Sequence, residues 1–220
     1  MIGTGRTAAR VAVAGVTLAA TFTGGAALAE TGQATGQFPR NFLLYESQAR
    51  KPVDDPTEEK WTISNKLSKN LGFFPCNLSK NTGSGRASAR TVEFTAPLFY
   101  RGEQLVVYRS AGAARDAMAG LLAQAGSCKR VKSGPAVFTA SAKPVSAGDQ
   151  AVRVAIQGYD PKSGRPTIDG QRAVVVRKGR ALAFYLLSGD YGKVRDSDFA
   201  EPLRDARKMA ARVCSLPGVC

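Results

Sequence analysis

A stretch of 19 residues, QRAVVVRKGRALAFYLLSG (residues 171–189), constrains the fold of this 220-residue chain more than any other segment. Its two arms, 173–176 and 181–187, are apolar at successive positions, which is typical of strands buried on both faces of a sheet. Lys178 and Gly179 lie between the arms and have residue types that suit a tight turn. The stretch is therefore predicted to form a hairpin that supplies the central strands of an antiparallel sheet.

Earlier segments of the chain show weaker strand patterns. Residues 91–96 alternate between apolar and polar side chains, residues 103–110 continue as a second strand, and a turn at 101–102 would join them into a hairpin. Residues 149–158 alternate clearly and residues 136–142 less so. The sheet is therefore expected to be a meander of antiparallel strands.

Two amphipathic helices are predicted, at residues 111–126 and 198–214. The second contains Pro202, which a helix tolerates in its first turn. The resulting fold class is α+β, with a twisted antiparallel sheet that the two long helices cover on one side.

The segment before the sheet is less regular. Residues 41–50 are compatible with a short helix, and residues 51–60 carry two prolines and four acidic residues, as an exposed loop would. Trp61, the only tryptophan, is interpreted as a half-buried anchor rather than as a residue that stacks on a ligand.

The first 29 residues have the layout of a secretory signal peptide. Arg6 and Arg10 precede an apolar run that ends in the small-x-small pattern of residues 27–29. An uncleaved anchor is the alternative, but the run is rich in Ala, Gly and Thr, which insert weakly into a bilayer. We expect a signal peptide at 1–29, a flexible segment at 30–54, a folded domain at 55–220 and a secreted product without a stable transmembrane anchor.

An exported chain with an even number of cysteines is expected to form disulfides, and this one has Cys76, Cys128, Cys214 and Cys220. Cys214 and Cys220 could pair across the turn at 216–218, which would leave Cys76 for Cys128. The two other pairings, which tie Cys214 to Cys128 or to Cys76, stay open. Metal and redox chemistry are disfavoured because the chain has no histidine and no Cys-x-x-Cys pair.

Most catalytic arrangements are absent from the sequence. Without histidine there is no Ser-His-acid or Cys-His site, and neither a Ser-x-x-Lys pattern nor a phosphate-binding glycine loop occurs. Carboxylates alone remain, as in a glycan hydrolase, and Asp54, Asp55, Glu58 and Glu59 cluster in the predicted loop. We expect no cofactor and no metal, and keep an envelope glycan hydrolase as the alternative function.

The chain is strongly basic, with 31 Lys and Arg, 17 Asp and Glu and a formal charge of +14. Removing residues 1–29 takes away two arginines and leaves +12. Such a surface favours anionic partners, although a role in solubility explains it equally well. Basic residues cluster on the last helix and around the central hairpin, where the candidate ligand-binding residues are Arg172, Arg177, Lys178 and Arg180.

Several segments resemble one known family: VVYRSAGAARDAMAGLLAQAGSC, AGDQAVRV, AVVVRKGRALAF and ARKMAARVC. Together they are similar to the extracellular sensor domain of actinobacterial receptor serine/threonine kinases, the PknH-type domain. The resemblance covers about residues 55–220. It implies a twisted antiparallel sheet with helices against it, two disulfides and a cleft for an unidentified ligand, and it supplies no catalytic residues.

The expected function is that of a secreted, non-enzymatic binding module at the cell envelope. Its partner would be an extracellular ligand, such as an anionic cell-wall polymer or a lipid headgroup, and the protein would be a monomer. Nucleic acid is not expected because no nucleic-acid-binding signature occurs.

Overall fold

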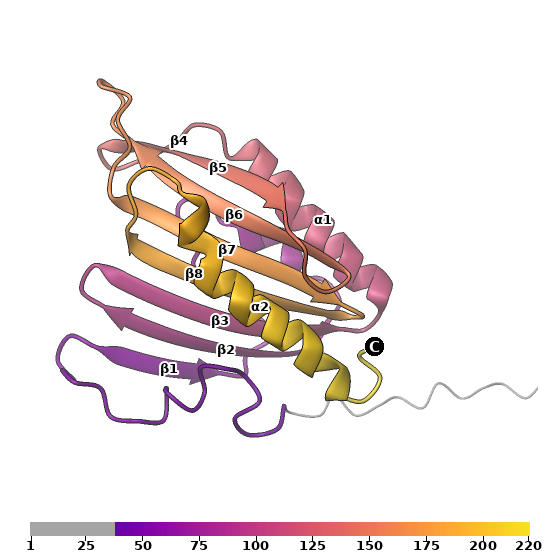
Figure 1. The fold of residues 1–220 in the computed structure, drawn as a ribbon. Helices are drawn as coiled ribbons and strands as arrows, with labels where there is room; N and C mark the ends of the chain where they lie inside the picture. The colour runs from indigo at the N-terminus through magenta and orange to yellow at the C-terminus, as the bar shows by residue number, and fades with distance from the viewer. Residues whose placement is uncertain (1–37) are drawn as a thin grey trace, which may run out of the picture. The chain divides into compact units, whose positions relative to one another are not determined.

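The computed structural model describes residues 38–220, so the predicted signal peptide and the start of the predicted flexible segment lie outside the described residues. The described chain forms one antiparallel sheet of eight strands in the order β1-β2-β3-β8-β7-β6-β5-β4 (Figure 1). The strands are β1 (Lys60–Ser64), β2 (Arg86–Ala96), β3 (Phe99–Tyr108), β4 (Val131–Ser133), β5 (Ala136–Pro144), β6 (Gln150–Tyr159), β7 (Asp169–Lys178) and β8 (Ala181–Asp190).

The central hairpin is confirmed. Strands β7 and β8 lie side by side inside the sheet, and Lys178 pairs with Ala181 at the closed end. The earlier hairpin is also present as β2 and β3, but its predicted turn at 101–102 is wrong. The chain turns at residues 97–98, and Gly102 lies inside β3, where it makes room for the Leu71 side chain instead of forming a turn.

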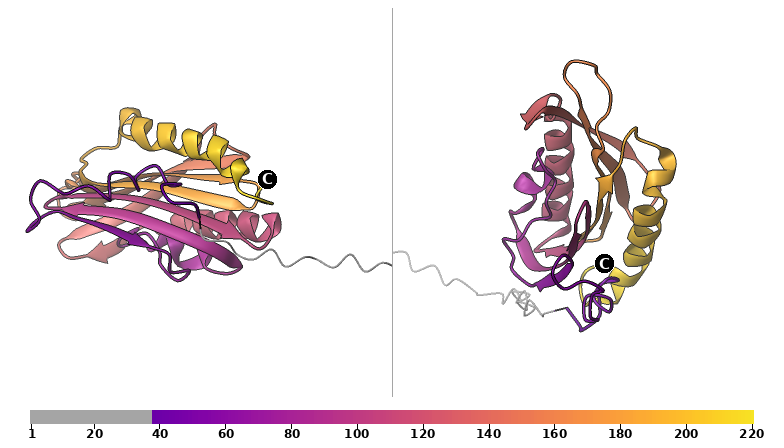
Figure 2. Two further views of the ribbon diagram at one scale, coloured as in Figure 1. Left: turned by 90° about the horizontal axis from the view of Figure 1, so that it is seen from below. Right: turned by 90° about the vertical axis from the view of Figure 1, so that its left-hand side faces the viewer.

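The two long helices lie on opposite faces of the sheet, so the expectation that both cover one side is wrong (Figure 2). Helix α1 (Ala111–Ser127) belongs to the core on the face that carries Val175, and α2 (Ala200–Arg212) belongs to the core on the face that carries Val174. The physical reason lies in β7 itself. Its apolar residues point to both faces, and both faces therefore have to be covered.

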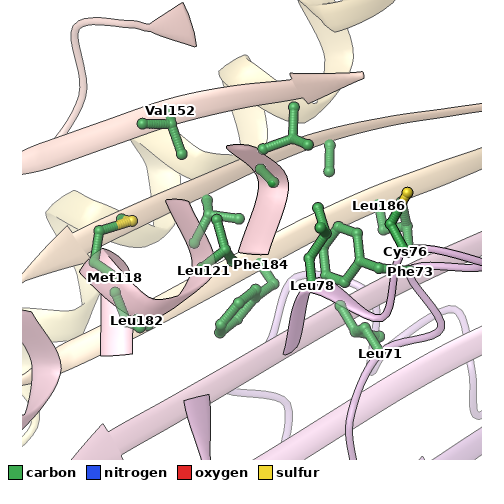
Figure 3. Close-up of a cluster of buried hydrophobic side chains, with 14 of the residues drawn as sticks. Leu71, Phe73, Cys76, Leu78, Met118, Leu121, Val152, Leu182, Phe184 and Leu186 are labelled. Atoms are coloured by element: carbon green, nitrogen blue, oxygen red, sulfur yellow. The ribbon is translucent and has the colours of Figure 1, made fainter. Parts of the chain in front are cut away.

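The core under α1 includes a loop that precedes β2 (Figure 3). Its buried apolar side chains share this core with Met118 of α1 and Phe184 of β8; they are Leu71, Phe73, Cys76 and Leu78. The loop is cross-linked to the end of α1 by a disulfide between Cys76 and Cys128. The loop therefore completes the cover on this face of the sheet.

Both expected disulfides are present, in the pairing Cys76–Cys128 and Cys214–Cys220. The first joins residues 52 positions apart and is buried, whereas the second closes a short exposed loop after α2. Within the described residues no cysteine is free.

The segment before β1 differs from the sequence-based expectation. Residues 41–50 form turns instead of a short helix, and residues 38–46 are packed rather than flexible, with Phe38, Phe42, Leu43 and Tyr45 buried in the core under α2. Residues 51–58 are mostly exposed loop, as predicted. The packing arises because this part of the α2 face, over β2 and β3, offers apolar side chains to the segment, while Arg90 and Glu103 bond to its backbone.

Candidate functional site

The structure does not bring the four predicted ligand-binding residues together. Arg172 is completely buried on the α2 face, and its Nε donates a hydrogen bond of 3.0 Å to the carboxylate of Asp198. Its two Nη atoms donate to three backbone oxygens and to Gln157 Oε1. Arg172 therefore holds the segment after β8 against the sheet, and its charge is already neutralised.

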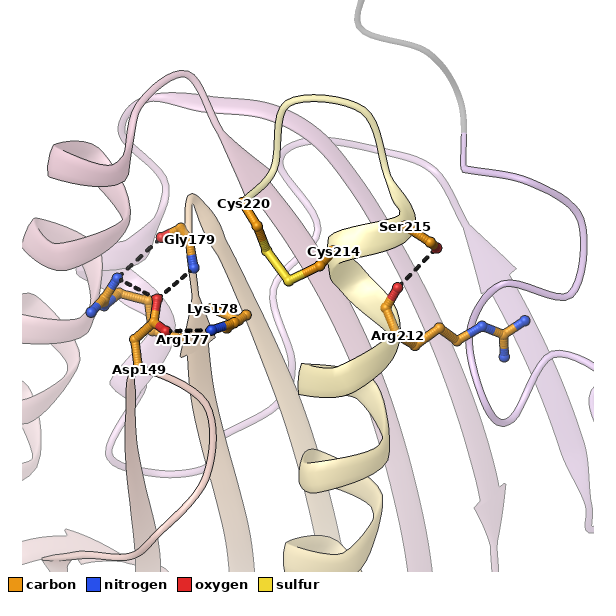
Figure 4. The surroundings of a disulfide bond; sticks show 8 residues. All are labelled: Asp149, Arg177, Lys178, Gly179, Arg212, Cys214, Ser215 and Cys220. Atoms are coloured by element: carbon orange, nitrogen blue, oxygen red, sulfur yellow. Dashed lines mark hydrogen bonds and ion pairs between the residues drawn. A yellow bond between two sulfur atoms is a disulfide. The ribbon is translucent and has the colours of Figure 1, made fainter.

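The other three predicted residues lie at the β7–β8 turn, and Figure 4 shows Arg177 and Lys178 there. Asp149 binds this turn closely: its carboxylate accepts from Lys178 Nζ at 2.8 Å, from the Gly179 amide at 2.7 Å and from Arg177 Nη1 at 3.4 Å. The Arg180 amide donates to the Val219 carbonyl and so connects the turn to the C-terminus. Asp149 therefore contacts two of the three basic side chains and offsets one of their three positive charges.

The outer face of α2 carries basic residues that the sequence analysis explained as a solvated helix surface. Four basic side chains lie at helical spacing on this face and are exposed: Arg204, Arg207, Lys208 and Arg212. Arg204 contacts Asp205, but within residues 38–220 the other three contact no carboxylate. The α2 basic face, as we name these four residues, therefore keeps most of its charge.

Two of these arginines are held in place by neutral groups. Arg207 Nε donates 3.1 Å to the Ser146 carbonyl, and Arg212 Nη2 donates 3.2 Å to the Asn41 carbonyl. The Arg212 guanidinium also lies 4.9 Å from the centre of the Phe42 ring, in a cation–π contact. Their orientation is thus restricted while their charge stays available to a ligand.

A cavity of about 350 Å³ lies elsewhere on the α2 face of the sheet, near the edge strand β1. It is lined by Trp61, Phe94, Phe99 and Arg101 from β1, β2 and β3, and by residues of the 48–59 segment. Two of the acids that the sequence analysis considered for hydrolysis line it, Asp54 and Glu59. They lie side by side, because the Glu59 carboxylate accepts from the Asp54 amide at 3.2 Å.

An acidic side chain without an ion-pair partner among the described residues is buried in the sheet. Glu103 of β3 is fully buried and accepts hydrogen bonds from the Leu44 and Tyr45 amides and from the Tyr185 hydroxyl. Burial raises the pKa of Glu103 to about 7, and the same burial raises the pKa of Tyr185. No side chain of a sequence-predicted site residue contacts it, and no sequence pattern marked it.

Two further features bear on the possible chemistry. Among residues 38–220, no cluster of three or more potential metal ligands is found. In the same range, no helix is both long enough and apolar enough to cross a membrane.

Comparisons with known proteins give a likeness among solved structures. No protein-family model and no curated protein matches the chain. Among solved structures, the extracellular domain of PknH from Mycobacterium tuberculosis is similar, with 9% sequence identity and a TM-score of 0.48, over 82% of this chain and 97% of that domain. A likeness at this level does not assign the chain to a family, and the function has to be argued from the surfaces described above.

Proposed function

We propose that this protein is an exported, non-enzymatic binding domain of the cell envelope that holds a linear anionic polymer on the α2 basic face. The observation that supports it most is that Arg207 and Arg212 are positioned by neutral oxygens rather than by carboxylates. A basic side chain that is already oriented loses less conformational freedom when an anion binds. Two disulfides and the predicted signal peptide favour an oxidising, extracytoplasmic compartment.

The α2 basic face suits a linear polymer better than a membrane. From Arg204 to Arg212 the helix rises about 12 Å, so the charges form a stripe rather than a broad patch. The apolar side of α2 is packed on the sheet and cannot insert into a bilayer. Within residues 38–220, the exposed large hydrophobic side chains lie on elements other than α2.

Binding of linear polyphosphate to the purified, oxidised protein tests the proposal. We expect saturable binding that weakens as salt rises from 50 to 300 mM, because exposed charges are screened over about 10 Å at 0.1 M ionic strength. Replacing Arg207, Lys208 and Arg212 with serine should weaken binding at least tenfold. Lys208→Glu alone should weaken it severalfold, because Lys208 is exposed and its side chain makes no hydrogen bond or ion pair within residues 38–220 that the change would break.

A matched control separates the effect of where the basic residues lie from the effect of the net charge of the protein. Lys129, Arg130 and Lys132 are exposed after α1, which packs on the opposite face, and their triple serine variant loses the same charge. It should bind like the wild type. An equal loss of affinity in both triple variants would mean that net charge alone causes the binding. Stronger binding to vesicles with anionic lipids than to polyphosphate would mean that the ligand is a membrane surface and not a polymer.

An envelope glycan hydrolase is the second candidate, and it is favoured by one observation, the two carboxylates in one cavity. Both belong to the same loop, however, whereas hydrolysis needs one carboxyl group on each side of the scissile bond. Incubation with cell-wall glycans and mass spectrometry of the products tests this candidate. Cleavage that disappears in Glu59→Gln would establish it and overturn the non-enzymatic proposal.

A further inference from the structure

The cavity beside β1 has a floor built by three neighbouring strands. Trp61 of β1 pairs directly with Phe94 of β2, and Phe94 pairs with Arg101 of β3, so the three side chains form a row across the sheet. Phe99 lies two residues before Arg101 on the same face of β3 and extends the row. The strand register, and not a flexible loop, therefore sets the relative positions of these side chains.

The rings in this row are close but not fully covered. The ring centres of Trp61 and Phe94 are 4.8 Å apart, and those of Phe94 and Phe99 are 6.1 Å apart. All three side chains keep exposed surface, and Phe99 is 37% exposed. Trp61 is half-buried, as predicted, but its uncovered part lines the cavity together with both phenylalanines, so it is placed to contact a ligand as well as to anchor its strand.

Polar side chains of mixed charge complete the lining. Gln48, Asp54 and Glu59 provide amide and carboxylate groups, while Lys51 and Arg101 provide positive charge. The Arg101 guanidinium lies 4.9 Å from the Tyr45 ring centre and pairs with Glu201 through Nη2, but its buried Nε has no hydrogen-bond partner within the described residues. The cavity therefore combines an apolar floor with hydrogen-bonding groups of both signs.

We infer that this cavity binds a short segment of uncharged oligosaccharide, with one sugar ring stacked on Trp61. A sugar ring has an apolar C–H face and an edge of hydroxyl groups, and the aromatic floor and polar wall match these two parts. Charges of both signs oppose a strongly charged ligand: Asp54 and Glu59 repel an anion and Lys51 repels a cation, while the charge of Arg101 is paired with Glu201. The volume of about 350 Å³ lies at the lower end of ligand sites, which span about 300–1,000 Å³.

This inference is independent of the proposed polymer site on α2. It uses none of the four residues of the α2 basic face, and binding of an uncharged sugar depends little on salt. An experiment can therefore contradict the sugar site in the cavity without contradicting the polymer site on α2, and the reverse.

Intrinsic fluorescence tests the inference directly, because Trp61 is the only tryptophan of the chain. The purified protein is titrated with neutral trisaccharides of glucose, mannose, galactose, arabinose and N-acetylglucosamine. At least one is expected to give a saturable change in Trp61 emission that is the same at 50 and 300 mM salt. Absence of a saturable change with all five trisaccharides overturns the inference.

Substitutions locate the binding. Phe99→Ala keeps the Trp61 reporter, removes a partly exposed ring and should weaken binding about tenfold; Trp61→Ala, followed by calorimetry, should abolish it. Phe74→Ala is the matched control, because Phe74 is 63% exposed and does not line the cavity. Unchanged binding in Phe99→Ala, or equal weakening in Phe74→Ala, would place the sugar elsewhere and contradict the inference. Cleavage of a bound trisaccharide would show that the cavity is the active site of a hydrolase and contradict a site for binding alone.

Discussion

The backbone amide of Tyr45 donates a hydrogen bond of 2.7 Å to the carboxylate of Glu103, and this contact connects the segment before β1 to the middle of the sheet. The Tyr45 hydroxyl donates in turn to Asp205 of α2 at 2.9 Å. One short segment is thereby fixed to β3 and to the C-terminal helix at once.

This arrangement predicts a stability that falls as pH rises. Burial raises the pKa of Glu103 from 4.5 to about 7, so the folded protein favours the protonated form. The stabilisation is fully present below pH 4.5 and is lost as pH rises through 7, by an amount on the order of 3 kcal/mol. Denaturant unfolding at a series of pH values between 4.5 and 8 should record this decrease in the free energy of unfolding.

Glu103→Gln is the control for that titration. The groups that face Glu103 are Tyr45, Tyr185 and Asp205, with Arg101 over the Tyr45 ring, and they remain in the variant. The variant should therefore lose most of the pH dependence between 4.5 and 7. An unchanged dependence would mean that another group causes it.

Arg172 and Arg177 should differ sharply in their effect on stability, although both belong to β7. Arg172→Met leaves Asp198 without its buried partner and should lower the free energy of unfolding by roughly 3–5 kcal/mol. Arg177→Met removes a partly exposed pair with Asp149 and should cost less than about 1 kcal/mol. Equal losses in urea unfolding would show that the burial of Arg172 has no energetic consequence.

The two disulfides are expected to contribute unequally. By loop-closure entropy, Cys76–Cys128 stabilises the fold by roughly 4 kcal/mol and Cys214–Cys220 by roughly 2 kcal/mol. Paired serine variants should show this order in urea unfolding. Since Cys214 and Cys220 are exposed, mild reductant should open that bond first, as peptide mapping would reveal; the reverse order would contradict the burial of Cys76 and Cys128.

Gly179→Ala should disturb the C-terminus. Gly179 has a φ of 54°, which costs a non-glycine residue about 1–2 kcal/mol, and an added Cβ would also collide with the Val219 carbonyl. Gly134 has a φ of 58° with open space around it, so Gly134→Ala isolates the backbone cost. The Gly179 variant should lose more stability and make the C-terminal loop more sensitive to proteolysis. Identical behaviour of both variants would refute the collision.

The six inner strands of the sheet were predicted because their signals are local, whereas the short edge strands β1 and β4 were missed. The apolar arms of the central hairpin and the helical spacing of residues 111–126 depend on neighbours in the chain, and both elements are present. The placement of the helices was missed, although the arms of the hairpin, apolar on both faces, carried the necessary signal. Packing of residues 38–46 was missed because their partners, Glu103 and Asp205, are distant in sequence.

The binding surfaces were less predictable than the fold. The sequence does not tell whether a basic residue is neutralised, and only the structure distinguishes Lys178, which contacts Asp149, from Arg212, which contacts a carbonyl. The row of Trp61, Phe94 and Phe99 was also not predicted, because the sequence does not show which distant residues become neighbours. Trp61 and Phe94 become neighbours through the pairing of an edge strand that no periodicity indicated.

The contacts of residues 38–46 also bear on the order in which the protein can fold. This segment is synthesised first among the described residues, yet its hydrogen-bond partners include Tyr45–Asp205 and Asn41–Arg212, which involve the last helix. This segment can pair with Arg90 and Glu103 earlier, but it completes its contacts only after the last helix has been made. Contacts between such distant residues slow folding. The first and last described segments thus depend on each other, so this part of the fold is completed only when synthesis of the chain is nearly finished.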